Sequence, residues 1–181
     1  MDIELLRRAL STSIDAAVRD GPRSPAAVLL TFYGPGEPTV IMTVKARHMR
    51  QHAGEVAFPG GKWEDGDADL LETAMREARE ELGLEIARAD VIGQLGDAET
   101  QSSGYVIAPF VHVLGERPDL LPNAEVEEVL EIPLAAILST ASVSGQLGVT
   151  LTHGPHTVWG ASARVLTEVG ERLRAAGGSL T

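Results

Sequence analysis

The chain has 181 residues, which is typical of one compact domain and short for two. Its 15 Lys and Arg residues against 26 Asp and Glu residues give a formal net charge of −11. Because nucleic-acid binding depends on a basic face, this balance argues against a nucleic-acid partner. The lack of cysteine excludes disulfides, thiolate metal sites and cysteine nucleophiles. The first residues lack the apolar core of a secretory signal, and no apolar run approaches a membrane span. We therefore expect a cytoplasmic protein without a membrane partner.

The beginning of the chain predicts a helix followed by a hairpin. Apolar residues spaced by three or four predict an amphipathic helix over residues 1–20, which Gly21–Pro25 break. Residues 26–33 and 39–44 are apolar and β-branched, and they flank the turn-forming residues 34–38. This pattern predicts a β-hairpin.

A glycine-containing segment precedes the clearest helix of the sequence. Phe58-Pro59-Gly60-Gly61 predicts a loop without regular structure. Residues 68–83 predict the helix, because Asp67 or Asp69 can cap its start and Gly83 can adopt a left-handed conformation at its end.

The second half of the chain alternates further strands and helices. The predicted strands are 90–95, 105–114, 126–131, 148–152 and 157–159, and the predicted helices are 134–138 and 161–176. Interspersed strands and helices favour an α/β sandwich. No linker divides the chain, so we expect one domain over residues 1–181.

Three glutamates gather on one side of the helix over residues 68–83. At 100° per residue, Glu77, Glu80 and Glu81 occupy an arc of roughly 100° beside the apolar face. The pair Glu77–Glu81 alone costs about 0.2–0.5 kcal/mol on an exposed helix. A hard cation such as Mg²⁺ or Mn²⁺ would offset this repulsion and would also bridge the carboxylates to phosphate oxygens. The alternative is a solvated acidic face on an acidic protein.

The glycine segment and the acidic helix together resemble the signature of the Nudix hydrolases. The match spans residues 60–84 and consists of Gly61, Asp67 and Arg76-Glu77-Ala78-Arg79-Glu80-Glu81-Leu82-Gly83-Leu84. The sequence departs from the usual signature at one point, where the acid is Asp67 instead of Glu and eight residues instead of seven separate it from Arg76. This departure bears on the orientation of Arg76. The resemblance implies an α/β/α sandwich with a mixed β-sheet between helices.

The resemblance also implies a reaction, the metal-dependent hydrolysis of a phosphoanhydride bond. Glu77, Glu80 and Glu81 would serve Mg²⁺ or Mn²⁺ ions, with the carbonyl of Gly60 as a further ligand. Arg76 would orient these carboxylates through charge-assisted hydrogen bonds.

The general base comes from different places in different family members. Glu125 is our first candidate and Glu99 the second, and the alternative for each is an ordinary surface acid. Trp159 either touches a nucleotide base or packs in the core.

Residues 41–61 resemble the additional motif of one branch, the coenzyme A pyrophosphohydrolases. The matching residues are Ile41-Met42-Thr43, Lys45, Arg50, His52, Gly54, Val56 and Phe58-Pro59-Gly60-Gly61. Lys45 and Ala46 depart from the Arg and Ser usual there. The residues that this resemblance assigns to substrate binding are Lys45, Arg47, Arg50, His52, Phe58 and Gly61.

The charge of residues 45–52 favours the same branch, because coenzyme A carries a 3′-phosphate besides its pyrophosphate. The alternative for this basic segment is pairing with the acidic surface. The implied products are 3′,5′-ADP and 4′-phosphopantetheine or its acyl form. Other readings are hydrolysis of another nucleoside diphosphate derivative, such as ADP-ribose or a dinucleotide, and a catalytically silent nucleotide-binding regulator. A small-molecule nucleotide and a second copy of the chain in a homodimer are the expected partners.

Overall fold

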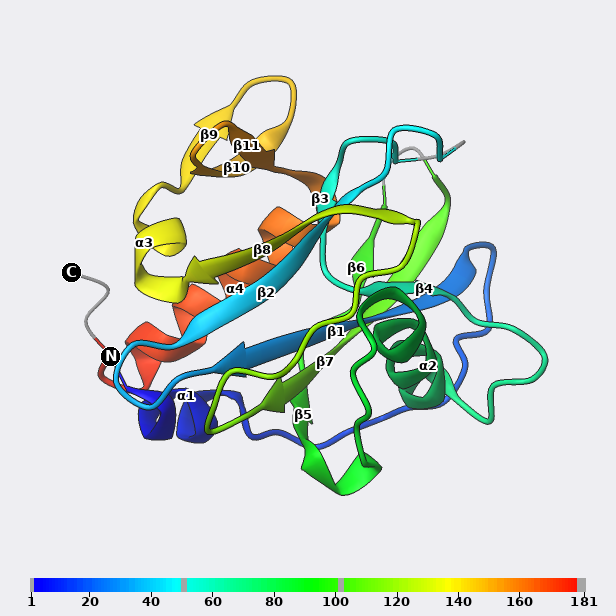
Figure 1. Cartoon of the computed structure of the whole chain (residues 1–181), viewed down its shortest axis with the longest axis horizontal. Helices are drawn as coiled ribbons and strands as arrows, with labels where there is room; N and C mark the ends of the chain where they lie inside the picture. The colour runs from blue at the N-terminus through cyan, green and yellow to red at the C-terminus, as the bar shows by residue number, and fades with distance from the viewer. Residues whose placement is uncertain (1, 50–51, 101–102, 179–181) are drawn as a thin grey trace.

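A computed structural model describes residues 2–49, 52–100 and 103–178 (Figure 1). Its helices are α1 Ile3–Leu10, α2 Leu70–Leu82, α3 Leu134–Ser139 and α4 Gly160–Ala175, with a short 3-10 helix at Arg88–Asp90. Its strands are β1 Ser24–Tyr33, β2 Thr39–Lys45, β3 Val56–Ala57, β4 Gly60–Lys62, β5 Val91–Gln94, β6 Ala98–Glu99, β7 Tyr105–Val113, β8 Val126–Pro133, β9 Ser142–Ser144, β10 Gly148–His153 and β11 His156–Val158. None of the described helices is long and apolar enough to cross a membrane.

Most strands form one mixed sheet with the central order β3-β2-β1-β7-β5. β1 and β7 run parallel, whereas the other pairs in this sheet are antiparallel. β1 and β2 pair only where Phe32 faces Val40 and Tyr33 faces Thr39. Beyond that point the two strands separate, and β1 pairs with β4 while β2 pairs with β3 and β8.

Helices cover both faces of this sheet (Figure 1). On one face, α2 packs its apolar side, including Ala74 and Leu82, against Leu29 and Phe110 of the sheet. On the other face, side chains of α1, α3 and α4 share a core with Leu30, Phe32 and Met42. The expected α/β/α sandwich with a mixed sheet is therefore confirmed. Strands β9, β10 and β11 form a separate three-stranded antiparallel sheet.

The predicted N-terminal helix is too long, because α1 ends at Leu10. After it, the amide of Thr12 donates to the carbonyl of Ile92 and the Thr12 hydroxyl donates to the carbonyl of Gln94 at 2.7 Å. The amide of Asp15 donates to the side chain of Gln94. Ser and Thr side chains compete for backbone hydrogen bonds, so the polar run Ser11–Ser13 ends the helix, and its backbone bonds strand β5 instead.

The prediction of an irregular loop at residues 58–61 holds for Phe58 and Pro59 and is wrong for Gly60 and Gly61. Gly60–Lys62 forms β4, which pairs with Ala26–Val28 of β1. A Cβ atom on Gly60 would lie 2.8 Å from the Cα of Val28, closer than such atoms approach. Glycine is therefore required here for two backbones to come together, which is its role inside a strand.

The other predicted elements agree with the structure to within two residues at each end. The predicted hairpin is present as β1 and β2, although it is paired only near its turn. Three short strands, β3, β6 and β9, were not predicted. Their three or fewer residues are too short to show a periodic pattern.

Candidate active site

Helix α2 begins and ends at residues that the sequence offered as caps. Asp69 is its N-cap and accepts a hydrogen bond from the amide of Glu72 at 2.9 Å. Gly83 ends the helix in the left-handed conformation, with φ of 69°. Asp69 and not Asp67 therefore caps the helix, so the carboxylate of Asp67 is available for other contacts.

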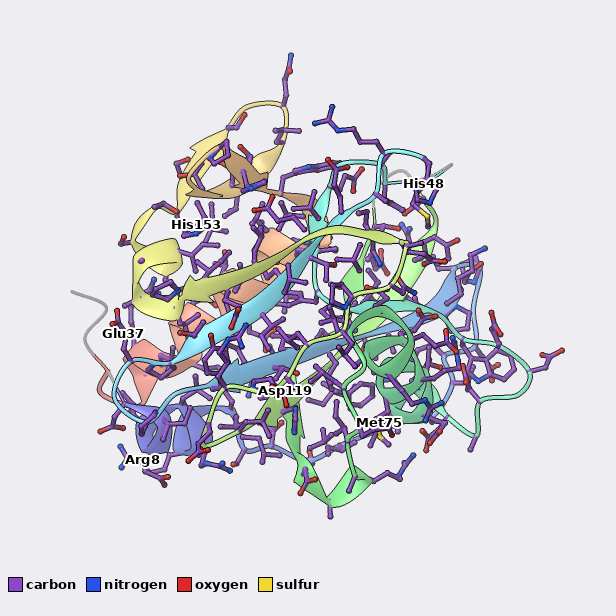
Figure 2. The ribbon with its side chains drawn as sticks, in the orientation of Figure 1. Arg8, Glu37, His48, Met75, Asp119 and His153 are labelled. Carbon is purple, nitrogen blue, oxygen red and sulfur yellow. The ribbon has the colours of Figure 1, made fainter. Side chains whose placement is uncertain are left out.

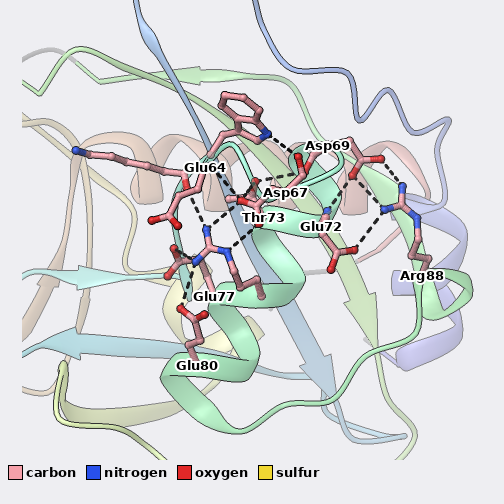
Figure 3. A network of polar contacts seen from close by, with 11 residues as sticks. Glu64, Asp67, Asp69, Glu72, Thr73, Glu77, Glu80 and Arg88 are labelled. Atoms are coloured by element: carbon pink, nitrogen blue, oxygen red, sulfur yellow. Dashed lines mark hydrogen bonds and ion pairs between the residues drawn. The ribbon is translucent and has the colours of Figure 1, made fainter.

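Asp67 binds Arg76 through two hydrogen bonds (Figure 3). The Nε and Nη2 atoms of Arg76 donate to the two carboxylate oxygens of Asp67 at 2.9 and 3.0 Å. From this position, Nη1 donates to Glu77 at 2.8 Å and to Glu80 at 3.2 Å. The extra residue at the helix start therefore does not prevent Asp67 from orienting Arg76, and Arg76 contacts both Glu77 and Glu80.

The buried Asp67–Arg76 pair predicts a pH-dependent contribution to stability. Burial by itself raises the pKa of Asp67, but the hydrogen bonds from Arg76 and Thr73 outweigh it and leave the pKa below its ordinary value of 3.8. A carboxylate with a lowered pKa stabilises the fold above its unfolded pKa, and this contribution is lost as the pH falls through the folded pKa. We expect Asp67→Asn to lower the free energy of unfolding by about 2 kcal/mol at neutral pH, with a difference that shrinks below pH 3.8.

Urea unfolding of both proteins from pH 7 to pH 3 measures this difference. Asp65→Asn is the matched control, because Asp65 lies in the same loop and is exposed. An Asp67→Asn deficit that stays constant over the whole pH range would contradict the assignment.

Glu81 is the most buried acid of the helix, with its side chain 1% exposed. Its Oε1 atom accepts a hydrogen bond from the Nζ atom of Lys45 at 2.5 Å. Its Oε2 atom has no hydrogen-bond partner among the described residues. Burial raises the pKa of Glu81, and the charge of Lys45 offsets only part of the rise. Burial likewise raises the pKa of Glu77 against the opposing effect of Arg76.

A cavity of about 960 Å³ opens where β1 and β2 separate, and Glu77 and Glu81 line it. The backbone of β4 and the loop after β2, which contains His48, also line it (Figure 2). The start of α4 and the loop between β9 and β10 complete the wall.

Nine of the candidate residues named from the sequence line this cavity. They are Lys45, His52, Phe58, Gly60, Gly61, Glu77, Glu81, Glu125 and Trp159, of which Trp159 is 36% exposed. Phe58 is 2% exposed and belongs mainly to the core. His52 contacts Glu55 at 2.9 Å. Glu125 is close enough to Glu81 for its charge to help raise the pKa of Glu81.

The structure places other predicted residues away from the cavity. The side chain of Arg47 is 85% exposed and forms an ion pair with Glu127. This agrees with the alternative that the basic segment pairs with the acidic surface, and not with phosphate binding by Arg47. Glu80 is 52% exposed and pairs with Arg76. Glu99 pairs with Arg23 and lines a smaller neighbouring cavity. Arg50 lies outside the described residues.

The donor atoms that line the cavity fit a hard divalent cation. The unpartnered Oε2 atom of Glu81 and the carboxylate of Glu77 offer anionic oxygen ligands. Within the part of the chain that the structure describes, no three Asp, Glu or His side chains meet as a complete metal cluster. Mg²⁺ usually takes one or two carboxylates and fills its remaining positions with water and substrate phosphate, so this set suffices.

Several residues that line the cavity were not predicted as site residues. Lys62, Tyr105 and Arg164 belong to three different elements, β4, β7 and α4. Lys62 directly follows the two glycines, a position that could have identified it. Tyr105 and Arg164 reach the cavity only through the tertiary fold, so their local sequence alone does not assign them to the site.

Substitution of the two adjacent glycines is expected to affect different properties, turnover at Gly61 and stability at Gly60. A Cβ atom on Gly61 would lie 2.5 Å from the Cδ atom of Glu77, whereas one on Gly60 would meet the backbone of Val28. We expect Gly61→Ala to displace the Glu77 carboxylate and to lower turnover by roughly a hundredfold. We expect Gly60→Ala to lower the free energy of unfolding by roughly 1–3 kcal/mol, because the backbone of Val28 cannot move away from the added Cβ atom as a side chain could.

Measuring turnover and urea unfolding on both variants separates the two effects. Gly61→Ala should change the free energy of unfolding by less than about 1 kcal/mol. Equal stability losses in the two variants would show that Gly61 serves the fold and not the position of Glu77.

Comparisons with known proteins agree with these features. Residues 22–149 match the family model described as the NUDIX domain. The chain is 35% identical over 183 residues to the protein of Mus musculus named mitochondrial coenzyme A diphosphatase NUDT8, covering 94% of this chain and 87% of that relative. It is 33% identical over 160 residues to a Nudix hydrolase of Photorhabdus laumondii named NudL, covering 82% of this chain and 84% of the relative.

Solved structures show the same fold at lower identity. A MutT/nudix family protein from Enterococcus faecalis aligns with a TM-score of 0.65 and 16% identity, covering 91% of this chain and 66% of that one. The NUDIX domain of Shewanella oneidensis NrtR, solved with ADP ribose, aligns with a TM-score of 0.61 and 16% identity, covering 85% of this chain and 90% of that one. The family model and the relatives together show that this chain belongs to the Nudix hydrolase family.

Proposed function

We propose that the protein hydrolyses the pyrophosphate bond of coenzyme A or its derivatives, with Mg²⁺ or Mn²⁺ as cofactor. The products are 3′,5′-ADP and 4′-phosphopantetheine or its acyl form. The observation that carries the proposal is the buried carboxylate oxygen of Glu81, which has no hydrogen-bond partner in the described part of the chain and lies at a cavity of about 960 Å³. The reaction has the chemistry that the name of the mouse relative gives for that protein.

The residues of the cavity would have different roles in this reaction. A divalent ion, when bound, supplies neutralisation of the pyrophosphate charge and acidification of a water molecule. Glu77 and Glu81 would hold it, with the carbonyl of Gly60 as a further predicted ligand, whereas Glu80 pairs with Arg76 outside the cavity. Arg76 keeps the Glu77 carboxylate in place through its bond at 2.8 Å. The absence of a side chain at Gly61 lets the Glu77 carboxylate lie against the backbone of β4.

Glu125 is the proposed general base and would accept the proton of the attacking water. Glu125 lines the cavity, and its backbone amide and carbonyl are both hydrogen-bonded. The amide of Glu125 donates to the side chain of Asn123 at 2.8 Å, and its carbonyl accepts from the amide of Ala46 at 2.8 Å. A carboxylate on a fixed loop beside Glu81 suits this role.

Incubation with coenzyme A and Mg²⁺, followed by mass spectrometry, tests the function. We expect 3′,5′-ADP and 4′-phosphopantetheine to appear together, and not to appear after addition of a chelator. ADP-ribose and a dinucleotide serve as parallel substrates. Cleavage of these without cleavage of coenzyme A would replace the proposal by a different substrate, and binding of coenzyme A without turnover would indicate a silent nucleotide-binding domain.

A further inference from the structure

Two basic side chains in the cavity form no ion pair with any carboxylate among the residues that the structure describes. Nine of the Lys and Arg residues in the described part of the chain form ion pairs with carboxylates. The described basic residues outside these pairs are Arg8, Lys62, Arg79, Arg164 and Arg174. Lys62 and Arg164 line the cavity, whereas Arg8 lies at the opposite end of the molecule from the cavity residue His48 (Figure 2). Arg164 also lines the smaller neighbouring cavity. In a chain of net charge −11, two cations at one cavity that form no ion pair among the described residues indicate an anionic ligand.

The basic segment expected to bind this ligand is largely engaged elsewhere. Lys45 donates to Glu81 and is 12% exposed, so its charge is neutralised by the catalytic helix. Arg47 pairs with Glu127 outside the cavity. The described part of residues 45–52 therefore offers no unpaired ammonium or guanidinium group to a phosphate.

Lys62 and Arg164 are both held beside the start of β7. The Nζ atom of Lys62 lies 5.6 Å from the centre of the Tyr105 ring. The Nη2 atom of Arg164 donates to the carbonyl of Glu99, whose strand β6 pairs with β7 at Val106. The first two residues of β7 thus bring together cations from β4 and α4.

Strand β4 separates these cations from the carboxylates of Glu77 and Glu81. Successive residues of a strand point to opposite faces. A Cβ atom on Gly61 would meet Glu77, so that face of β4 looks toward α2. Lys62 follows Gly61 and pairs with Ala26 of β1, so it faces the side of the sheet that α4 covers. An anion bound at Lys62 and Arg164 is thereby kept apart from the carboxylates of Glu77 and Glu81.

We propose that Lys62 and Arg164 form a subsite for a phosphomonoester group of the substrate. A dianionic phosphate suits a planar guanidinium, which donates two parallel hydrogen bonds, together with a lysine point charge. Where the substrate is coenzyme A, the group is its 3′-phosphate, an identification that rests on the proposed function. The pyrophosphate then lies on the acidic side of β4, and the 3′-phosphate on the basic side.

Calorimetric titration of the full chain with 3′,5′-ADP and with 5′-AMP, both without metal, tests the subsite directly. The wild-type protein should bind the bisphosphate more tightly. Lys62→Met and Arg164→Met should each weaken bisphosphate binding by roughly tenfold or more and change 5′-AMP binding by less than about twofold. Arg174→Met is the control, because Arg174 is an unpaired arginine of the same helix outside the cavity.

Equal losses for the two nucleotides, or an equal effect of Arg174→Met, would overturn the subsite. So would a wild-type protein that does not distinguish them. In kinetics, the same variants should lower kcat/KM for coenzyme A relative to dephospho-coenzyme A. A protein that cleaves neither compound but keeps the Lys62- and Arg164-dependent preference for the bisphosphate would refute the proposed function and leave the subsite intact.

Discussion

Glu81→Gln is expected to reduce Mg²⁺-dependent hydrolysis by at least about a hundredfold while the fold stays intact. Glutamine has the shape of glutamate but offers a neutral amide oxygen in place of the unpartnered, buried Oε2 atom. Hard cations bind such an oxygen much more weakly than a carboxylate. Initial rates over a range of Mg²⁺ concentrations, with calorimetric titration of Mn²⁺, measure the loss.

Glu72→Gln provides the matched control on the same helix. Glu72 lies at the first turn of α2, near Arg88 and outside the cavity, so its neutralisation should leave the rate within about twofold of wild type. An unchanged rate of Glu81→Gln at saturating Mg²⁺ would refute the metal assignment.

Lys45→Met is expected to lower the free energy of unfolding by about 3 kcal/mol at neutral pH without added metal. The change leaves the Glu81 carboxylate, 1% exposed, without the cation that contacts it at 2.5 Å. Removing one partner of a buried pair is costly because the remaining charge stays desolvated. Addition of Mg²⁺ should recover part of the loss, since a ligand that binds only the folded state stabilises it. Urea unfolding with and without Mg²⁺ measures both effects.

Two further variants determine whether charge is the cause. Lys45→Arg keeps the positive charge and should recover more than half of the loss. Lys62→Met makes the same chemical change at a cavity lysine without a carboxylate partner among the described residues, and should cost less than about 0.5 kcal/mol. Equal destabilisation by Lys45→Met and Lys62→Met would show that the pairing with Glu81 is not what stabilises the fold.

The parts of the site that follow from local sequence were predictable. Helix α2, its left-handed end at Gly83 and the grouping of Glu77 with Glu81 depend on spacing along one helix. The same reasoning placed Glu80 with them, but it could not show that Arg76 holds Glu80 on the exposed side.

The remaining differences come from contacts between residues distant in the sequence. Lys45 looked available for phosphate because its partner Glu81 is 36 residues away in the chain. The apolar spacing of the N-terminal segment continues past Leu10, yet its backbone bonds β5 instead of forming a longer helix. Gly60 and Gly61 looked like turn residues, whereas their small size serves close packing against β1 and Glu77.

The two-sided arrangement of β4 has a consequence for altering selectivity. Because neighbouring residues of this short strand face different helices, a library of substitutions at Lys62, Tyr105 and Arg164 would vary the surroundings of the proposed phosphate subsite. The carboxylates proposed to bind the ion would keep their surroundings, so selectivity is expected to change without loss of hydrolysis.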